Sequence, residues 1–320
     1  MPKVLDNLLQ SLVTETDPVS RLPLDHLSDL SADAVSELED LWNSIPAARR
    51  LELLKELGDR EAINFDLDFS SVYFLGLKDH DPGVIAVSIN NLSEIENRTF
   101  FPSLLELISH TDTRVREAAA AALGYFIYLG ELDEIKSEET NRAVQILLDV
   151  FKTGTSTEVR CRALESLGYS SHIDVPNIIL DSLNSNEHPF IVSAIKAIGR
   201  SADLSWKPYI LKRLHSTHPE IRLETVRSAG ELELREAVED LIELLDDVDR
   251  QIHLAAIWSL AQIGGDNIQE IFLHILSDCE DIEEADLLED ALDLLEFNAG
   301  SGDFLLLDLE HEPDDPFTAT

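Results

Sequence analysis

The stretch HTDTRVREAAAAALG, residues 110–124, contains the pattern from which most of the chain is built. Three later stretches repeat it: TSTEVRCRALESLG, NEHPFIVSAIKAIG and STHPEIRLETVRSAG, which end at Gly168, Gly199 and Gly230. Each copy has a β-branched or bulky residue nine positions before its last glycine, and we call this residue the anchor. Recurrence at a fixed period of this size is typical of stacked supersecondary units.

The anchor recurs along most of the chain. Extending the register in both directions gives six anchors, which are Val84, Val115, Val159, Phe190, Ile221 and Ile252. Successive anchors are 31 residues apart except for one interval of 44, and we assign the surplus to a polar insertion near 127–139, between two helices. A weaker copy, PAARRLELLKELG, precedes the series, and a degenerate one, EEADLLEDALDLLEF, follows it.

Each repeat is predicted to be a pair of helices. The anchor and positions +1, +4, +5 and +8 after it lie on one face of a helix. Small residues at +4 and +7 would let neighbouring helices approach closely, and the glycine at +9 could end the helix in a left-handed conformation. Because a single helix pair cannot bury its own apolar face, the pairs must stack. The pattern therefore predicts an all-α protein of stacked helix pairs with a period of about 31 residues.

The repeated pattern xVRxxAxxALG, with Pro or Asp just before it, resembles HEAT-like repeats of the short bacterial type named after phycobilisome lyases. The stretches GRSADLSWKPYI and IWSLAQIGG also look like an uncharacterised bacterial HEAT family. The resemblance covers about residues 35–296 and implies a right-handed α-solenoid with the second helices on the concave side. It also implies that the arginine after the anchor ties adjacent repeats through acidic partners. Arg116, Arg160 and Arg222 match this arginine, whereas Ile191 and His253 depart from it and are expected to interrupt the ladder.

The repeats divide the chain into three parts. We expect an N-terminal helical cap or extension over residues 1–34, a solenoid of about seven to eight helix pairs over 35–296, and an acidic tail over 297–320. The tail is expected to leave the helical pattern at about Ala299. Its apolar patch either packs on the last repeat as a cap or is a short docking motif; the patch consists of Phe304, Leu305, Leu306 and Leu307.

The net charge of −39 is distributed unevenly. Residues 1–150 carry −16, residues 151–230 carry +2, and residues 231–320 carry −25. An acidic chain repels phosphate groups, which disfavours nucleic acid as a partner. We expect a protein partner that is acidic where it meets the central segment or basic where it meets the acidic ends.

Composition also suggests a location. No apolar run approaches the roughly 18–20 residues that span a bilayer, and the N-terminus does not have the pattern of a signal peptide. The two cysteines, Cys161 and Cys279, lie far apart in the sequence and are expected to be reduced thiols. We therefore expect a cytoplasmic protein.

Motifs that would indicate catalysis are missing from the sequence. The ten histidines include no HExxH pattern. Deoxyhypusine hydroxylases, diiron enzymes with this architecture, need repeated His-Glu dipeptides, and this chain has one, His311-Glu312. His80, His188 and His218 are expected at turns between helices, where a histidine caps a helix or faces water. We expect no catalytic residue, no cofactor and no metal.

Positions +6 and +10 lie opposite the apolar stripe and are predicted to face the concave surface. In the central repeats they carry Lys196, Arg200 and Arg227, with Tyr169 on one side and Trp258 on the other. Arginine beside exposed aromatic side chains is typical of an interface hot spot. The alternative is that Glu165 and Glu231 neutralise these cations as surface pairs, each of which contributes little.

The repeats and the charged face are compatible with two functions. The first is a non-enzymatic scaffold or adaptor that binds a protein or peptide on its concave face. The second rests on the resemblance to phycobilin lyase subunits. It is a lyase- or chaperone-like subunit that handles a pigment or prosthetic group on a client protein.

Overall fold

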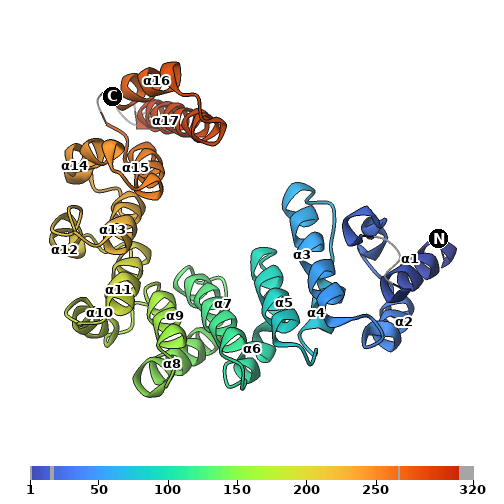
Figure 1. Ribbon diagram of the computed structural model, residues 1–320. Helices are drawn as coiled ribbons and strands as arrows, with labels where there is room; N and C mark the ends of the chain where they lie inside the picture. The colour runs from blue at the N-terminus through green and yellow to red at the C-terminus, as the bar shows by residue number, and fades with distance from the viewer. Residues whose placement is uncertain (1, 15–17, 266, 310–320) are drawn as a thin grey trace, which may run out of the picture. The chain divides into compact units, whose positions relative to one another are not determined.

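The computed structural model describes the backbone of residues 2–14, 18–265 and 267–309, and in these ranges it contains helices and turns but no β-strand. The fold is an all-α solenoid, as the repeat pattern predicts. The chain forms two compact units, unit 1 (Met1–His172) and unit 2 (Ile173–Thr320). Figure 1 shows the helices of each unit.

Unit 1 is a row of helices with a second layer of helices packed on it. Its α-helices are α1 (Pro2–Thr14), α2 (Ala32–Trp42), α3 (Ala47–Ile63), α4 (Ser70–Gly76), α5 (Pro82–Glu94), α6 (Phe101–Leu107), α7 (Thr113–Glu131), α8 (Ser137–Thr153) and α9 (Thr157–Leu167). Short 3-10 helices are η1 (Val19–Arg21), η2 (Leu24–Leu27) and η3 (Arg98–Phe100). Helices α3, α5, α7 and α9 lie side by side, and α4, α6 and α8 pack against them as a second layer.

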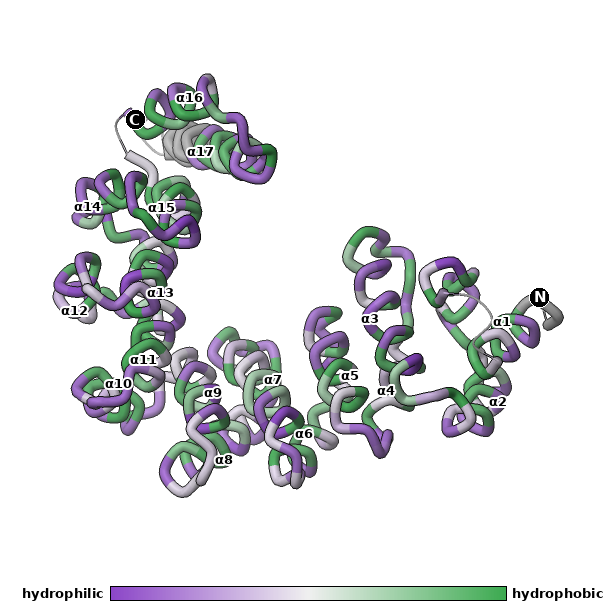
Figure 2. Tube along the Cα trace, viewed as in Figure 1, coloured by the Kyte–Doolittle hydropathy of each residue, from purple (hydrophilic) through white to green (hydrophobic). Residues whose placement is uncertain are grey.

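Unit 2 repeats this arrangement. Its α-helices are α10 (Val175–Leu183), α11 (His188–Arg200), α12 (Lys207–Leu211), α13 (Pro219–Glu231), α14 (Val238–Glu243), α15 (Arg250–Ile263), α16 (Ile268–Asp278) and α17 (Ile282–Leu309). The 3-10 helices are η4 (Leu204–Trp206), η5 (Arg235–Ala237) and η6 (Leu244–Asp246). Helices α11, α13, α15 and α17 form the row, and α10, α12, α14 and α16 form the second layer. Each helix carries both apolar and polar residues (Figure 2), as an amphipathic helix with one apolar face requires.

The predicted register of the second helices is confirmed. All six anchors are buried, with at most 5% of each residue exposed, and every residue at +8 is fully buried. The small residues at +4 and +7 are buried as well, from Ser88 and Asn91 in α5 to Ala256 and Ser259 in α15. Each row therefore packs through one recurring set of helix positions, and the sequence pattern predicted that set.

The role predicted for the glycine at +9 is wrong. Gly124, Gly199 and Gly230 lie inside α7, α11 and α13, and none of them has a positive φ. They are small because the next helix is close: a Cβ on Gly124 would lie 2.7 Å from the Ser166 hydroxyl oxygen in α9. Close packing between neighbouring helices, and not the end of a helix, explains these glycines.

Side chains at +7 bind the preceding helix of the row. Ser228 Oγ donates to the carbonyl oxygen of Ile195 at 3.0 Å, and Ser166 Oγ donates to that of Ala120 at 2.9 Å. In each case the acceptor is the residue at +5 of the previous repeat. A similar contact joins Asn91 Nδ2 in α5 to the carbonyl oxygen of Leu54 in α3 at 2.8 Å. These hydrogen bonds fix the register of one repeat on the next.

The residue at +1 forms the expected ladder only in part. Arg222 Nε lies 2.7 Å from Asp247 Oδ2, so its predicted acidic partner is confirmed. Arg116 and Arg160 donate to main-chain carbonyl oxygens of their own repeats. The expectation that His253 interrupts the ladder is wrong, because its Nε2 lies 3.0 Å from Glu284 Oε1 in α17.

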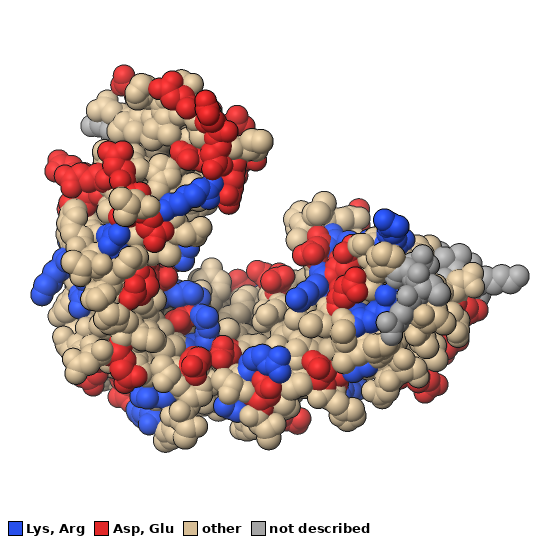
Figure 3. Space-filling view, viewed as in Figure 1, with Lys and Arg blue, Asp and Glu red and all other residues tan. Residues whose placement is uncertain are grey.

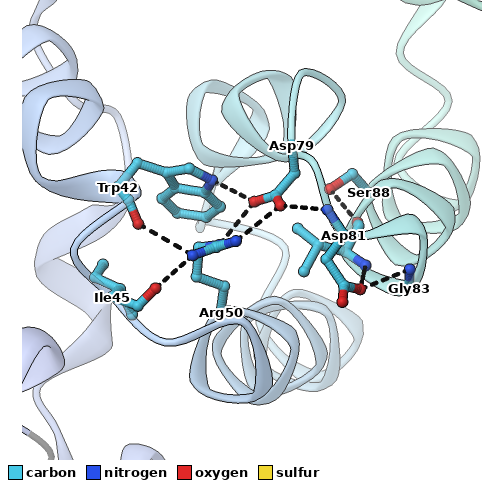
Figure 4. A network of polar contacts seen from close by, with 8 residues as sticks. Trp42, Ile45, Arg50, Asp79, Asp81, Gly83 and Ser88 are labelled. Atoms are coloured by element: carbon cyan, nitrogen blue, oxygen red, sulfur yellow. Dashed lines mark hydrogen bonds and ion pairs between the residues drawn. The ribbon is translucent and has the colours of Figure 1, made fainter.

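The most buried ion pair of a +1 residue lies in the weak first copy of the repeat, PAARRLELLKELG, in unit 1, where Arg50 is at +1. Arg50 Nε and Nη2 lie 2.7 and 2.8 Å from the two carboxylate oxygens of Asp79. Trp42 Nε1 donates to the same carboxylate at 2.6 Å, and the backbone N–H of Asp81 donates to it at 2.8 Å (Figure 4). Arg50 also donates to the carbonyl oxygen of Ile45. The hydrogen bonds to its charged form hold the pKa of Asp79 below its usual range, even though burial opposes this.

The segment predicted as a polar insertion near 127–139 corresponds in the structure to the end of α7, a short connection and the start of α8. Helix α7 continues to Glu131 and α8 begins at Ser137. Ile127 is fully buried and Leu129 is 3% exposed. Ile127 and Leu129 therefore extend the buried part of α7, whereas residues 131–139 are exposed or half-buried.

The C-terminal helix is longer than the sequence pattern predicts. Helix α17 continues to Leu309, beyond the expected end near Ala299. The side chains of the apolar patch, Phe304, Leu305, Leu306 and Leu307, lie outside the described residues. Among the helices that the structure describes, none combines the length and apolar character needed to cross a membrane.

Candidate functional site

Four of the five residues predicted for the binding face lie on one row of helices in unit 2. Lys196 and Arg200 are on α11, Arg227 is on α13, and Trp258 is on α15. Tyr169 follows α9 in unit 1, where its ring centroid lies 5.5 Å from that of Tyr128. The structure therefore places three cations and the tryptophan on three consecutive helices of one unit, and the tyrosine in the other unit.

Two of these side chains line the same hollow. The hollow has a volume of about 360 Å³ and lies along α13, α15 and α17; we call it the α13–α15 hollow. Arg227 and Trp258 line it together with the aliphatic side chains of Leu254 and Leu287. Trp258 is 41% exposed, whereas the two other tryptophans, Trp42 and Trp206, are 4% and 6% exposed. Trp258 is thus a large apolar side chain that the core does not use.

Two carboxylates accompany the three cations. Arg227 Nη1 lies 3.8 Å from Glu224 Oε2 on the same helix. Glu231, the last residue of α13, lines the hollow, and its Oε2 sits so close to Gly199 that a Cβ there would overlap with it. Glu231 as a whole is exposed, but the close approach of its carboxylate to α11 partly desolvates it. This desolvation and the nearby Glu224 raise the pKa of Glu231, while Arg200, Lys196 and Arg227 act in the opposite direction.

The predicted neutralisation of the cations by Glu165 and Glu231 stays a prediction. Glu231 interacts with all three cations. Glu165 lies in unit 1 and accepts a hydrogen bond from Arg162 at 2.6 Å. The group formed by Lys196, Arg200, Arg227, Glu224 and Glu231 keeps a net charge of +1. It lies in the same unit as a strongly acidic surface over α14 to α17, which Figure 3 shows in red.

Sequence reasoning missed a second hollow, in unit 1. It has a volume of about 640 Å³ and is lined by Glu61, Phe65, Asp68 and Glu94, among others. Phe65 is 93% exposed. The available sequence signal was the alternation of apolar residues with Asn and Asp in INFDLDF, residues 63–69.

The buried glutamate of this hollow is tied to the protein. Glu61 accepts hydrogen bonds from the Phe69 backbone N–H at 2.8 Å and from the Tyr73 hydroxyl at 2.5 Å. Burial raises the pKa of Glu61 despite these two donors. Burial and the neighbouring Glu61 also raise the pKa of Tyr73. These contacts give Glu61 a structural role.

The cysteines and histidines occupy different settings. Cys161 on α9 is buried, and only 7% of it is exposed. His215 Nε2 lies 3.0 Å from Asp240 Oδ1, and His188 Nδ1 lies 2.9 Å from Glu220 Oε1. Within the described residues, one group of side chains could hold a metal ion through three ligands: His188, His218 and Glu220.

Comparison with solved structures gives similarities of fold. The chain has a TM-score of 0.42 and 16% identity to an Escherichia coli protein, YibA, and the similarity covers 78% of this chain and 98% of that one. Human deoxyhypusine hydroxylase in complex with glycerol gives 0.35 and 16%, covering 81% and 95%. Importin beta gives 0.43 and 13%, covering 92% of this chain and 46% of that one. No curated protein matches the chain.

Comparison with protein families gives a direct assignment. Residues 74–168, 177–261 and 207–293 match the HEAT repeats family, and together these ranges span well over half of the chain. They contain the second helices α5, α7, α9, α11, α13 and α15, on which the predicted anchors lie. The chain therefore belongs to the HEAT repeat family.

Proposed function

We propose that the protein is a non-enzymatic binding scaffold, and that unit 2 holds an acidic protein segment with an apolar side chain. The observation that carries the proposal is that Arg227 and Trp258 are both exposed and line the same hollow. A carboxylate of the partner would pair with Arg227, and its apolar side chain would lie against Trp258. Tyr169 lies in unit 1 and is not needed for this site.

The charges around the hollow support an acidic partner. Lys196 and Arg200 lie on the next helix of the row, and both lower the pKa of Glu231 through their positive charges. Arg227 lines the hollow, and Lys196 and Arg200 add positive charge near Glu231 at its edge. Such complementarity sets specificity and the rate of association more than it sets affinity. The affinity would come from burying Trp258 and desolvating Arg227.

The row of helices that carries the site is fixed before binding. Ser228 binds the carbonyl oxygen of Ile195, and Ser259 binds that of Val226, so α11, α13 and α15 are joined in sequence. A surface held in this way loses little freedom on binding, which favours affinity.

The test is binding of a labelled glutamate-rich peptide with one central phenylalanine, measured by fluorescence anisotropy. We expect the wild-type chain to bind it, and we expect binding to weaken as salt shortens the Debye length below about 10 Å. The triple variant Lys196→Glu, Arg200→Glu and Arg227→Glu should lose binding while its helical content and melting temperature stay close to those of the wild type. Reversing three tail acids, Asp308, Glu310 and Asp315, should have a much smaller effect.

The controls separate charge from shape. A peptide in which lysine replaces each glutamate should not bind at this site, and one in which alanine replaces the phenylalanine should bind more weakly. If the tail reversal abolishes binding and the triple variant does not, the site lies at the acidic end of the chain and the proposal is wrong.

A further inference from the structure

Two histidines and a glutamate meet at the N-terminal ends of α11 and α13 in unit 2. His188 is the first residue of α11, and His218 is the N-cap residue of α13. Their ring centroids lie 4.0 Å apart, with the ring planes inclined at 60°. Glu220, in the first turn of α13, lies 2.9 Å from His188 Nδ1. One ligand atom from each of the three residues lies within 4.8 Å of the other two.

The backbone holds this group in place. A proline follows each histidine directly, Pro189 in α11 and Pro219 in α13, and both lie in the first turn of their helix. Proline fixes φ at these positions and therefore limits where each histidine backbone can lie. The two helices are neighbours in the row, and Ser228 joins them through its hydrogen bond to Ile195. The three side chains therefore come from adjacent repeats that are already in register.

Other histidine–carboxylate pairs in unit 2 show what is particular to this group. His215 and Asp240 lie 3.0 Å apart, and His253 and Glu284 also lie 3.0 Å apart. Each of these pairs joins one repeat to the next, but neither belongs to a three-ligand group among the described residues. A simple pairing between repeats needs one histidine and one acid. It gives no reason for a second imidazole packed against the first.

Two imidazole nitrogens and one carboxylate oxygen are a ligand set that suits zinc. Zn²⁺ binds histidine nitrogen at about 2.0–2.1 Å and carboxylate oxygen at about 2.0–2.2 Å, in tetrahedral geometry. Two ligands of a tetrahedral zinc ion then lie about 3.3 Å apart. His188 Nδ1 and Glu220 Oε1 would separate slightly, and the remaining ligand distances would shorten from at most 4.8 Å, which side-chain rotation allows because the group is partly exposed. The ion would replace the proton shared by these two atoms.

We propose that His188, His218 and Glu220 form a zinc site that joins two adjacent repeats through their helix N-termini. Three protein ligands leave one position of the tetrahedron open, for water or for a donor group from another molecule. The site consists of residues other than those of the α13–α15 hollow, so it does not depend on the proposed function. Bound zinc would stabilise the α11–α13 contact, because the ion binds only where both helices are folded and adjacent.

The experiment is titration of the metal-free full-length chain with Zn²⁺ by isothermal calorimetry, with thermal unfolding measured in parallel. The variants are His188→Gln, His218→Gln and Glu220→Gln, and the matched control is His215→Gln, which removes a histidine from a pair without a third ligand. We expect one zinc ion per wild-type chain. Each of the three ligand variants should weaken binding by about ten-fold or more, and His215→Gln should bind as the wild type does.

Thermal unfolding distinguishes loss of zinc binding from loss of folding when a variant is less stable than the wild type. Zinc should raise the melting temperature of the wild type and of His215→Gln, and should not raise that of the ligand variants. The melting temperatures without zinc show whether each variant folds. Equal zinc affinity in all five proteins would overturn the proposal. So would a loss in His188→Gln and Glu220→Gln with none in His218→Gln, because the second imidazole would then not be a ligand.

Discussion

Ser259 in α15 lies directly against Gly230 in α13. A Cβ on Gly230 would stand 2.8 Å from Ser259 Oγ and 2.9 Å from its Cα. The Ser259 hydroxyl donates to the carbonyl oxygen of Val226 at 2.9 Å, one helical turn before the glycine. The glycine at +9 of one repeat and the serine at +7 of the next are therefore two halves of one contact.

Replacing Gly230 by alanine should destabilise the protein by about 1–3 kcal/mol, because the added methyl group overlaps the backbone of α15. Alanine is otherwise favoured over glycine inside a helix by about 1 kcal/mol. The matched control is Ala121→Gly on the exposed face of α7, which should cost about 1 kcal/mol through helix propensity alone. Urea unfolding measures both changes. A stabilised Gly230→Ala variant would show that α13 and α15 are not in close contact at this point.

Removing the buried cation of the Trp42–Arg50–Asp79 network should be costly. Arg50→Met leaves the carboxylate of Asp79 buried without its charge partner, and we expect a loss of about 3–5 kcal/mol. Lys78→Met removes an exposed pair with Glu39 in the same unit and should change stability by about 0–1 kcal/mol. Equal effects in urea unfolding would mean that the Arg50–Asp79 pair contributes no more than a surface contact.

Deleting residues 127–139 should strongly destabilise unit 1. The deletion removes Ile127 and Leu129 from the core, and large core side chains contribute about 2–5 kcal/mol each. A short Gly-Ser insertion after Glu134, in the connection between α7 and α8, should have little effect because loop closure depends weakly on length. Circular dichroism and thermal unfolding distinguish the two. A deletion variant as stable as the wild type would show that Ile127 and Leu129 do not contribute to the core and that the whole segment is a polar insertion.

Glu231→Gln should change how stability depends on pH. The pKa of Glu231 is raised above its ordinary value of 4.5, so the folded chain holds this proton more tightly than the unfolded chain does. Its contribution to stability therefore falls as pH rises from the ordinary value through the raised one. The variant should lack this fall and be more stable at neutral pH, by less than about 1 kcal/mol since the residue is exposed. An unchanged difference between variant and wild type from pH 4 to pH 8 would contradict the raised pKa.

The sequence predicted the helix pairs and the buried positions because each repeat must bury the same face. The anchors and +8 positions could be read from one repeat and transferred to the others. The role of Gly230 could not be predicted in this way. A glycine that allows close helix packing and a glycine that ends a helix look the same in the sequence. The spacing between Val115 and Val159 likewise showed that residues had been added, but not that Ile127 and Leu129 extend a core helix.

Helical periodicity also predicted part of the candidate site. Helical periodicity placed Arg227 and Trp258 on the solvent-facing side, and they line one hollow. Periodicity alone does not show which units a chain forms, so it grouped Tyr169 with residues of the other unit. The meeting of His188 with His218 depends on how two helix N-termini stack, and local sequence does not encode that.

The central claim is that Trp258, beside Arg227, contacts an acidic partner. The most direct measurement is ¹⁹F NMR of the chain labelled with 5-fluorotryptophan, which gives one signal for each of the three tryptophans; Trp258→Phe assigns the signal of interest. Titration with the glutamate-rich phenylalanine peptide should shift the Trp258 signal and leave those of Trp42 and Trp206 in place, and the shift should vanish in Arg227→Glu. A Trp258 signal that does not move while the peptide binds would contradict the account.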